Sequence, residues 1–388
     1  MFRLHSARTG GNQTVTQSIA ITGTGLFTPA QGIENDELVK SFNTYVDNYN
    51  RSHEAAIERG ELEALAHSSA EFIEKASGIK HRYVMVKEGI LDPEVMMPLI
   101  PERPADSLSM QAEMGILAAK EALSNAGLTP ADIDLVIVAC AYTQRAYPAI
   151  AIEIQQQLGT RGFAFDMQVA CSSATFGLST AQGLISQGSA RRALVICPEI
   201  CSAQVNYRDR DSHFIFGDVA TAMVVEPLLG SKGRQSFEIL GSNLVTEFSG
   251  NIRSNFGFLN RCDPASANAA DKLFHQQGRK VFKELLPMIY SHLDTQFASA
   301  GIDPTALSRL WLHQANINMN QFVVKKLLGD GVSAETAPIV LDRYANTASA
   351  GSVIALHLHQ QGLSSGDLGL LCSFGAGYSI GSFILKTR

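Results

Sequence analysis

The sequence predicts an α/β fold built from two similar halves. Apolar runs typical of buried strands, such as IDLVIVACA (133–141), alternate with segments whose apolar residues recur at the i, i+3 and i+4 spacing of helices. The segment NAGLTPADIDLVIVAC (125–140) also matches SAGIDPTALSRLWLHQ (299–314). A twofold duplication of α/β units predicts two similar mixed sheets that share central helices.

Two further pairs of segments extend this internal repeat. FDMQVACSSA (165–174) parallels LDRYANTASA (341–350). ARRALVICPE (190–199) resembles GDLGLLCSFG (366–375). The seam between two related halves is a natural place for an active site, because segments from both halves meet there.

Length and composition allow a large folded core. The 388 residues are 45% hydrophobic and 18% charged, enough for two fused halves, which we expect at 1–230 and 231–388. The net charge of −6 argues against a general nucleic-acid binder. The six cysteines form no CxxC pair, and MFRLHSARTGGNQTVTQ (1–17) lacks the apolar core of a signal peptide. We therefore expect the protein to be located in the reducing cytoplasm. With no uninterrupted run of about 18 apolar residues, no membrane span is expected.

The N-terminal third is predicted to combine core elements with inserted segments. SIAITGTGLFTP (18–29) is typical of a strand that enters a tight glycine-rich turn, and its GxG lacks the later glycine of a dinucleotide site. Residues 34–76 are predicted to be helical and charged, and the prolines in 86–106 predict an irregular excursion. Both segments are interpreted as insertions. The core resumes with a helix from residue 107 that leads into the strand at 133–141.

Cys171 is the first candidate for chemistry. It lies among small residues in DMQVACSSATFG (166–177), where an apolar strand is predicted to become a helix. The positive end of a helix dipole and its free N–H groups favour a thiolate over a thiol, whose usual pKa is about 8.5. We therefore expect Cys171 to be a nucleophile, whereas Cys140 and Cys197, inside apolar strands, are interpreted as small buried hydrophobes.

His313 and Asn346 are candidates for catalysis only if they lie beside a nucleophile. Alone, His313 after RLWL would be interpreted as a core histidine, and Asn346 as a turn or cap residue. A neutral imidazole and an amide can both donate hydrogen bonds to an enolate oxygen. Such preorganised donors can each be worth roughly 3 kcal/mol in a site poor in water.

Five segments of the chain resemble the thiolase superfamily, and most closely its β-ketoacyl-acyl-carrier-protein synthase III group, and they occur in the order found in that family. The likeness covers most of the chain. It implies a five-layered αβαβα fold, a homodimer and a catalytic triad of Cys171, His313 and Asn346. The matching segments are FDMQVACSSATFG (165–177), FGDVATAMVVE (216–226), HQAN (313–316), LDRYANTASAGSV (341–353) and SFGAGYSIGS (373–382).

The resemblance implies a two-stage reaction without a bound cofactor or metal. Cys171 attacks an acyl thioester while backbone N–H groups of Cys171 and of the loop Gly375, Ala376 and Gly377 hold the oxyanion. A malonyl thioester then loses carbon dioxide, and the enolate, held by His313 and Asn346, attacks the acyl group. Asn346 favours decarboxylation over the thiolase reaction, because non-decarboxylating thiolases carry a histidine there.

The resemblance also implies substrate and partner contacts. Acyl carrier protein is expected as a partner, with acyl-CoA or acyl-carrier-protein as first donor and malonyl-carrier-protein as second. Phe72 stands where a tryptophan is usual, Ala76 and Asn318 where arginines are usual, so contacts to coenzyme A and to the carrier are in doubt. The implied residues are Tyr147 (acyl pocket of the partner subunit), Phe72, Arg210, Asn316 and Phe374 (substrate) and Lys283, Lys325 and Lys326 (carrier docking).

Two other functions stay open at this point. Relatives of this fold move an acyl group from a thioester to an oxygen or amine acceptor, without carbon dioxide release. A non-enzymatic chain-length subunit would usually lack the nucleophile, which is present here as Cys171. The two inserted segments are expected to cover the acyl entrance and to adapt the enzyme to a longer, branched or specialised acyl donor.

Overall fold

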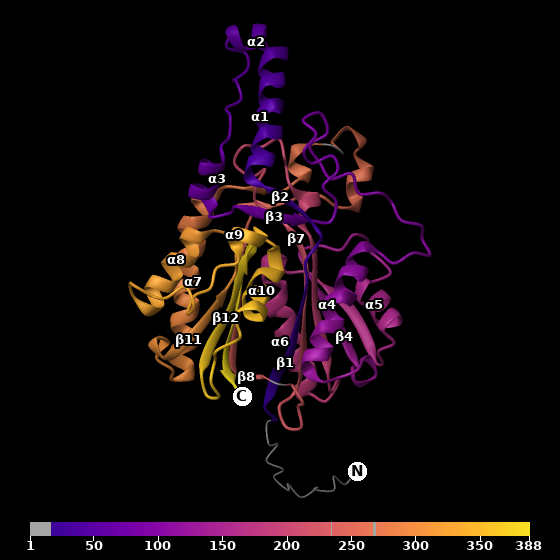
Figure 1. The fold of residues 1–388 in the computed structure, drawn as a ribbon, viewed down its shortest axis with the longest axis vertical. Helices are drawn as coiled ribbons and strands as arrows, with labels where there is room; N and C mark the ends of the chain where they lie inside the picture. Colours follow the sequence, from indigo (N-terminus) through magenta and orange to yellow (C-terminus); the bar gives the residue numbers. More distant parts are fainter. Residues whose placement is uncertain (1–16, 234, 267–268) are drawn as a thin grey trace, which may run out of the picture.

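The computed structural model describes residues 17–233, 235–266 and 269–388. Residues 1–16, which hold most of the stretch used for the signal-peptide expectation, lie outside that description. The central feature is a nine-stranded mixed sheet with the order β11-β12-β13-β8-β1-β7-β6-β4-β5 (Figure 1). Its strands are β1 (Ile19–Phe27), β4 (Leu135–Ala139), β5 (Phe163–Met167), β6 (Ala193–Ile200), β7 (Asp218–Pro227), β8 (Phe237–Ser249), β11 (Leu307–Leu312), β12 (Leu368–Gly375) and β13 (Gly377–Thr387).

The strand pairing repeats the internal duplication seen in the sequence. β4 is parallel to β6, β6 is antiparallel to β7, and β7 is antiparallel to β1. In the C-terminal half β11, β12, β13 and β8 pair with the same directions. The register agrees as well, since Val136 pairs with Leu194 and Leu310 with Leu370. A short β1–β8 contact joins the two sets of strands.

Helices cover and separate the two sets of strands. α4 and α5 pack on the N-terminal strands, and α7 packs on β8 and β13 and against α8. α6 and α10 contact strands of both halves and lie between them (Figure 1). The predicted five-layered αβαβα arrangement is therefore confirmed. The helices are α4 (Met110–Ala126), α5 (Ile150–Leu158), α6 (Ser173–Ser186), α7 (Gly278–Ala300), α8 (Ile317–Leu328) and α10 (Gly351–Leu358).

The apolar sequence runs form the central strands. Every residue of β4 (LVIVA) and of β6 (ALVICPEI) is buried. Strands covered by helices on both faces need apolar side chains in succession, and the β-branched residues in both runs suit the pleated sheet. Burial of these strands fixes the positions of their carboxyl ends, where the candidate active site lies.

The glycine-rich turn predicted in the first strand is wrong. Gly23 and Gly25 lie inside β1, which continues to Phe27. A Cβ atom at either position would collide with backbone of α4, at the carbonyls of Ala122 and Ala118. The two glycines therefore allow close packing of a helix on a strand, which a single sequence does not distinguish from a turn.

The first inserted segment is helical, as predicted. It contains α1 (Asn35–Ser52), α2 (Glu54–Glu58) and α3 (Ala70–Ser77), and is flanked by the small sheet of β2 (Gln31–Glu34) and β3 (His81–Val84). α1 begins with a capping box in which Glu34 and Glu37 satisfy each other's backbone N–H groups. The outer parts of α1 and α2 project beyond the sheet (Figure 1). Residues 86–106 contain turns and no helix or strand, as predicted.

We propose that the halves divide near residue 230. β7 ends at Pro227, and β8, which starts at Phe237, pairs along most of its length with β13 of the C-terminal half. No helix in the described ranges is long and apolar enough to cross a membrane. All six cysteines are free thiols.

Candidate active site

Cys171 lies in a short 3-10 turn, η2 (Ala170–Ser172), between β5 and α6. Ala170 has a positive φ of 45°, which turns the chain sharply before the helix begins. The Ser173 hydroxyl donates to the carbonyl of Cys140, which ties the turn to the end of β4. The thiol therefore sits at the start of α6, as predicted.

The C-terminal hairpin closes over Cys171. A Cβ atom at Gly375 would lie 2.6 Å from Cβ and 3.0 Å from Sγ of Cys171, so only glycine fits. The backbone N–H groups of Ala376, at the turn from β12 to β13, and of Cys171 itself act on the thiol and oppose the rise of its pKa. Two backbone donors from different halves of the chain thus converge on one sulfur atom.

The expectation of a lowered thiol pKa is wrong for this state of the protein. Burial raises the pKa of Cys171 to about 12, with a smaller contribution from the negative charge of Glu199. The two backbone N–H contacts act in the opposite direction but do not outweigh burial. Cys171 is therefore a protonated thiol at neutral pH.

His313 follows β11 directly and is 1% exposed. Its backbone N–H donates to the carbonyl of Cys372 at 2.8 Å, and its ring packs edge-on against Phe374 at 5.4 Å between centroids. Burial lowers the pKa of His313 to about 4, so the imidazole is neutral at pH 7. Nδ1 has no hydrogen-bond partner within the described part of the chain.

Asn346 lies between α9 (Leu341–Tyr344) and η8 (Ala348–Ala350). Its backbone is fixed by hydrogen bonds to Ile215 and Gly217 at 3.0 and 3.1 Å. The side-chain oxygen accepts from the N–H of Ala348 at 2.9 Å. Since the oxygen is engaged, the NH2 group is the part of the amide that can serve a ligand.

The triad segments meet at the β12–β13 hairpin. Phe374 contacts the ring of His313, and the next residue, Gly375, lies against Cys171. The turn η2 also packs on η8, which follows Asn346. The sequence match of 165–174 with 341–350 sets Asn346 next to the position that corresponds to Cys171. The elements refine this: Ser349, in η8, is the counterpart of Cys171, and Asn346 lies three residues earlier.

The residues inferred for substrate contact fall into two groups. The guanidinium of Arg210 stacks 3.8 Å above the ring of Phe72, and its Nε donates to the carbonyl of His67 at 2.7 Å. The stack brings two predicted residues together. Phe374 is 1% exposed and supports the His313 ring, and Asn316 caps α8 and donates to the carbonyl of Ala76 at 2.8 Å.

The predicted partner contacts lie on the surface. Tyr147, before α5, is 84% exposed. Lys283 on α7 and Lys325 and Lys326 on α8 are exposed on two helices that pack together. Lys325 is paired with Asp330 at 2.9 Å, which offsets part of its charge.

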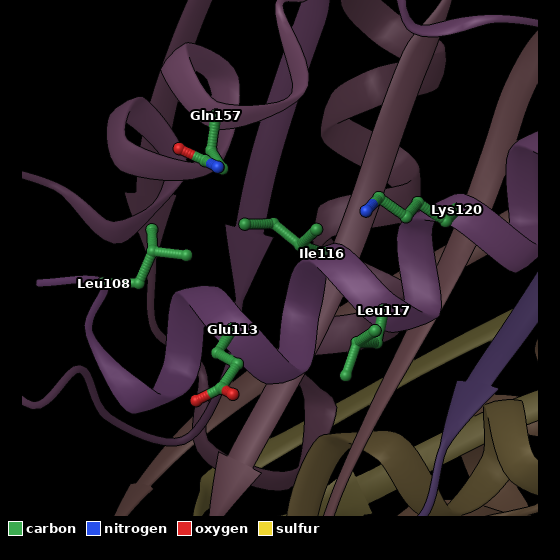
Figure 2. A pocket seen from close by; sticks show the side chains of 6 residues that line it. All are labelled: Leu108, Glu113, Ile116, Leu117, Lys120 and Gln157. Atoms are coloured by element: carbon green, nitrogen blue, oxygen red, sulfur yellow. The ribbon is translucent and has the colours of Figure 1, made fainter.

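Two surface pockets are separate from the triad. A pocket of about 220 Å³ lies between α4 and α5 and is lined by Ile116, Leu117, Lys120, Glu113, Leu108 and Gln157 (Figure 2). A second, of about 580 Å³, lies where α1 meets the irregular excursion, beside Tyr45 and Arg208. Neither contains a residue proposed for chemistry.

The sequence interpretation missed Glu199 and Ser349. Glu199 is fully buried at the end of β6, and Ser349 hydrogen-bonds it from η8. The repeat contained a signal for Glu199, since aligning 190–199 with 366–375 sets it opposite Gly375.

Comparison with known proteins agrees with this geometry. Models of the 3-oxoacyl-[acyl-carrier-protein] synthase III family match residues 165–247 and 297–387. The chain is 56% identical, over 90% of its length and 99% of the relative's, to a β-ketodecanoyl-[acyl-carrier-protein] synthase of Pseudomonas aeruginosa. It is 33% identical, over 84% and 93%, to a β-ketoacyl-[acyl-carrier-protein] synthase III of Agrobacterium fabrum. A crystal structure of the Aquifex aeolicus 3-oxoacyl-[acyl-carrier-protein] synthase III superposes with a TM-score of 0.72 at 26% identity, covering 95% and 99% of the two chains. The chain therefore belongs to the β-ketoacyl-acyl-carrier-protein synthase III family of condensing enzymes.

Proposed function

We propose that this protein transfers an acyl group from a thioester to Cys171 and condenses it with a malonyl thioester on acyl carrier protein. The products are a β-ketoacyl thioester, carbon dioxide and a free thiol. The observation that supports this best is the position of Cys171, with its sulfur against Gly375 and within reach of the N–H groups of Cys171 and Ala376. These donors suit a tetrahedral oxyanion formed at an acyl group on this sulfur.

In the first stage the Cys171 sulfur attacks the acyl carbonyl carbon. The carbonyl oxygen becomes an oxyanion, and the backbone N–H groups of Cys171 and Ala376 hold it. The donor thiolate then leaves and takes up the proton that the Cys171 thiol has lost. An acyl-enzyme results.

In the second stage His313 and Asn346 act as hydrogen-bond donors. With a pKa near 4, His313 is neutral, and its ring N–H can donate a hydrogen bond to the malonyl thioester oxygen. The Asn346 NH2 group donates beside it, since its oxygen is held by Ala348. As carbon dioxide leaves, the enolate forms under these donors, its carbon attacks the acyl group, and the Cys171 thiolate departs.

We infer a medium-chain acyl donor. The Pseudomonas aeruginosa relative is named for a β-ketodecanoyl product. Malonate contributes two carbons of such a ten-carbon product, so its acyl donor carries eight. Cys171 borders a buried apolar cluster that includes Phe216, Tyr207 and Cys201, which suits an alkyl chain better than an acetyl group alone.

We also propose a homodimer that works in the cytoplasm. β5 is the last strand of the sheet, and an edge strand exposes unpaired backbone groups that a second copy can pair with. Tyr147 and Phe163 are 84% and 40% exposed near this edge, which supports their burial by a partner. Free cysteines throughout the chain support a reducing compartment.

Intact-mass measurement tests the proposed function. The protein is incubated with even-numbered acyl chains from acetyl to dodecanoyl, each on coenzyme A and on acyl carrier protein, and then with malonyl-carrier-protein. We expect the largest mass gain with an octanoyl donor, no gain in Cys171→Ala, and carbon dioxide release with product formation. Acyl transfer to an oxygen or amine acceptor without carbon dioxide release would instead support the acyltransferase function.

A further inference from the structure

Glu199 is a buried carboxylate with no role in the chemistry described above. It lies at the end of β6 and is 0% exposed. It accepts hydrogen bonds from the N–H of Ala141 at 2.9 Å, from the N–H of Ser349 at 3.2 Å and from the Ser349 hydroxyl. The Cys201 thiol lies 3.7 Å from it. A buried carboxylate is costly unless it is bonded, and here three segments satisfy it.

The duplication explains why this carboxylate is present. The paired registers of the two halves set Glu199 of β6 opposite Gly375 of β12. The turns η2 and η8 correspond as well, because each begins with an alanine of positive φ, 45° at Ala170 and 46° at Ala348. Ser349 is therefore the counterpart of Cys171.

The end of one strand and the turn beside it form one station: Gly375 with Cys171 is the first, and Glu199 with Ser349 is the second. The two stations are filled differently. At the first, Gly375 has no side chain and leaves the Cys171 sulfur room to carry an acyl group. At the second, the Glu199 side chain occupies the corresponding space and binds Ser349. The fold thus has one station open for chemistry and one that is closed by a carboxylate.

The closed station connects both catalytic turns. Ser349 lies in η8, three residues after Asn346, and its hydroxyl also donates to the carbonyl of Ala139. Ala141, which donates to Glu199, follows Cys140, whose carbonyl accepts from Ser173, the residue directly after the Cys171 turn. Glu199 therefore links the end of β4, the nucleophile turn and the Asn346 turn across the seam of the molecule.

We propose that Glu199 is a positioning residue that closes the second station, fixes the Asn346 turn relative to the Cys171 turn, and places one negative charge beside the thiol. The positioning effect on decarboxylation rests on the proposed function. The effect on the thiol does not, because any alkylating reagent can report it.

The charges around Glu199 support the second effect. Burial raises the pKa of Glu199 to about 7, and the ionised carboxylate in turn raises the pKa of Cys171. The neighbouring thiols and phenol are uncharged near pH 7, because burial raises their pKa values. They are Cys140 and Tyr142 after β4, Cys197 on β6, and Cys201 in η3 (Cys201–Gln204).

Two further carboxylates act on this group. Asp166 on β5 raises the pKa of Cys140, and it is bonded by the N–H groups of Ile150 and Ala151. Asp218 on β7 raises the pKa of Cys201 and Tyr142, and burial raises its own pKa to about 6. It is bonded by Ser202 and by the N–H of Met85, not by the catalytic turns. Glu199 is thus the carboxylate whose charge acts on Cys171 as the pH rises through neutrality.

The thiol arm of the test measures the pH dependence of Cys171 alkylation by iodoacetamide, with the Cys171→Ala variant as the blank that measures background alkylation of the exposed Cys262. In the parent protein thiolate formation is coupled to Glu199, so the profile is broader than a single titration. Glu199→Gln keeps the shape and removes the charge. We expect its profile to become a single titration shifted to lower pH, by on the order of one unit. A profile identical to the parent's would overturn the electrostatic role.

The positioning arm measures carbon dioxide release from malonyl-carrier-protein against acylation of Cys171. Glu199→Ala is expected to lower release on the order of tenfold to a hundredfold while acylation persists, because small misplacements of catalytic groups are costly. If Glu199→Ala does not fold, Ser349→Ala replaces it in the test, because this variant leaves Glu199 in place but removes the hydroxyl that it binds. The same loss of carbon dioxide release is expected. Unchanged release in the folded variant would overturn the positioning role.

A matched control separates the specific effect of Glu199 from the general effect of losing a buried carboxylate. Glu226 on β7 is 1% exposed and bonded to Thr22 and Arg192, away from the triad. Glu226→Gln is expected to change neither the alkylation profile nor the ratio of release to acylation. If the parent protein acylates Cys171 but releases no carbon dioxide, the proposed function fails, and the alkylation result still judges the role of Glu199.

Discussion

At the scale of single residues, the balance of burial and dipole decides how Cys171 behaves. Charge at a helix N-terminus is typically worth 0.3–1 kcal/mol, less than one pKa unit, since one unit corresponds to about 1.4 kcal/mol. Burial can shift a pKa by up to about 3–5 units in the opposite direction. The rise of the Cys171 pKa to about 12 follows from this difference. Sequence reasoning located the thiol but could not weigh its burial, which arises from β12 and from residues distant in the chain.

The roles of His313 and Asn346 can be separated from that of Cys171 by single substitutions. In His313→Ala and Asn346→Ala we expect acylation of Cys171 to stay within a few-fold of the parent. Release of carbon dioxide should fall on the order of a hundredfold, because each loses one preorganised donor worth roughly 3 kcal/mol. Intact mass and carbon dioxide assays measure the two steps. Full condensation by either variant would contradict the assigned roles.

The pH dependence of the parent enzyme bears on the same residues. Because burial lowers the pKa of His313 to about 4, the imidazole is neutral both at pH 6 and at pH 9. The decarboxylation rate is therefore expected to show no inflection from His313 in this range. An inflection near pH 6.5 that disappears in His313→Ala would mean that the imidazole titrates normally and is not sequestered.

At the scale of elements, the sequence predicted helices and strands better than their packing. The helices in 34–76 and the strand before His313 were predicted correctly, because capping residues and apolar periodicity are local signals. The glycines of β1 were misassigned to a turn, because the feature that requires them is the approach of α4. The stack of Arg210 on Phe72 likewise joins residues that no local pattern relates.

The inserted helices allow a prediction about which part of them the fold needs. Phe42 and Val46 in α1 are buried beside Phe214 and Phe216, so deleting residues 40–65 is expected to unfold the protein. Asn50 exchanges hydrogen bonds with Leu65, which brings the two chain positions together. Replacing residues 51–64 by a short Gly-Ser link should therefore keep the fold.

Thermal unfolding and the acyl-chain panel measure the outcome. We expect the shortened protein to keep its melting temperature within a few degrees, since no residue of α2 is buried. Its acyl-chain preference should also stay unchanged, because the base of α1, and not the tip, packs on the cluster beside Cys171. A changed preference in the folded variant would assign the acyl entrance to the tip instead.

At the scale of the whole molecule, the duplication was readable in the sequence, whereas its functional asymmetry was not. The matching segments predicted two similar halves, and strand pairing repeats between them. Gly375 leaves the first station open, and Glu199 closes the second. The sequence alone does not show this difference, because it depends on the contact of each residue with its turn. Docking surfaces also belong to this scale, because they combine helices that are separate in the chain.

Charge reversal on α7 and α8 tests the proposed carrier surface. The chain carries a net charge of −6, so an acidic carrier protein needs a local basic patch to approach it. We expect Lys283→Glu and Lys326→Glu to raise KM for malonyl-carrier-protein on the order of tenfold at low salt, with kcat nearly unchanged. Lys325→Glu should have a smaller effect, because Asp330 already offsets that charge.

The control for this experiment is the exposed Lys120 on α4, beside the pocket of Figure 2 and on the other outer layer of the fold. Lys120→Glu changes the net charge by the same amount, so an effect of total charge alone would appear there too. Acylation by small coenzyme A thioesters should be unaffected in every variant, since they do not use the carrier surface. Added salt should reduce the differences between variants, because exposed charges are screened over about 10 Å at 0.1 M. Equal effects of Lys120→Glu and Lys283→Glu would place carrier recognition elsewhere on the molecule.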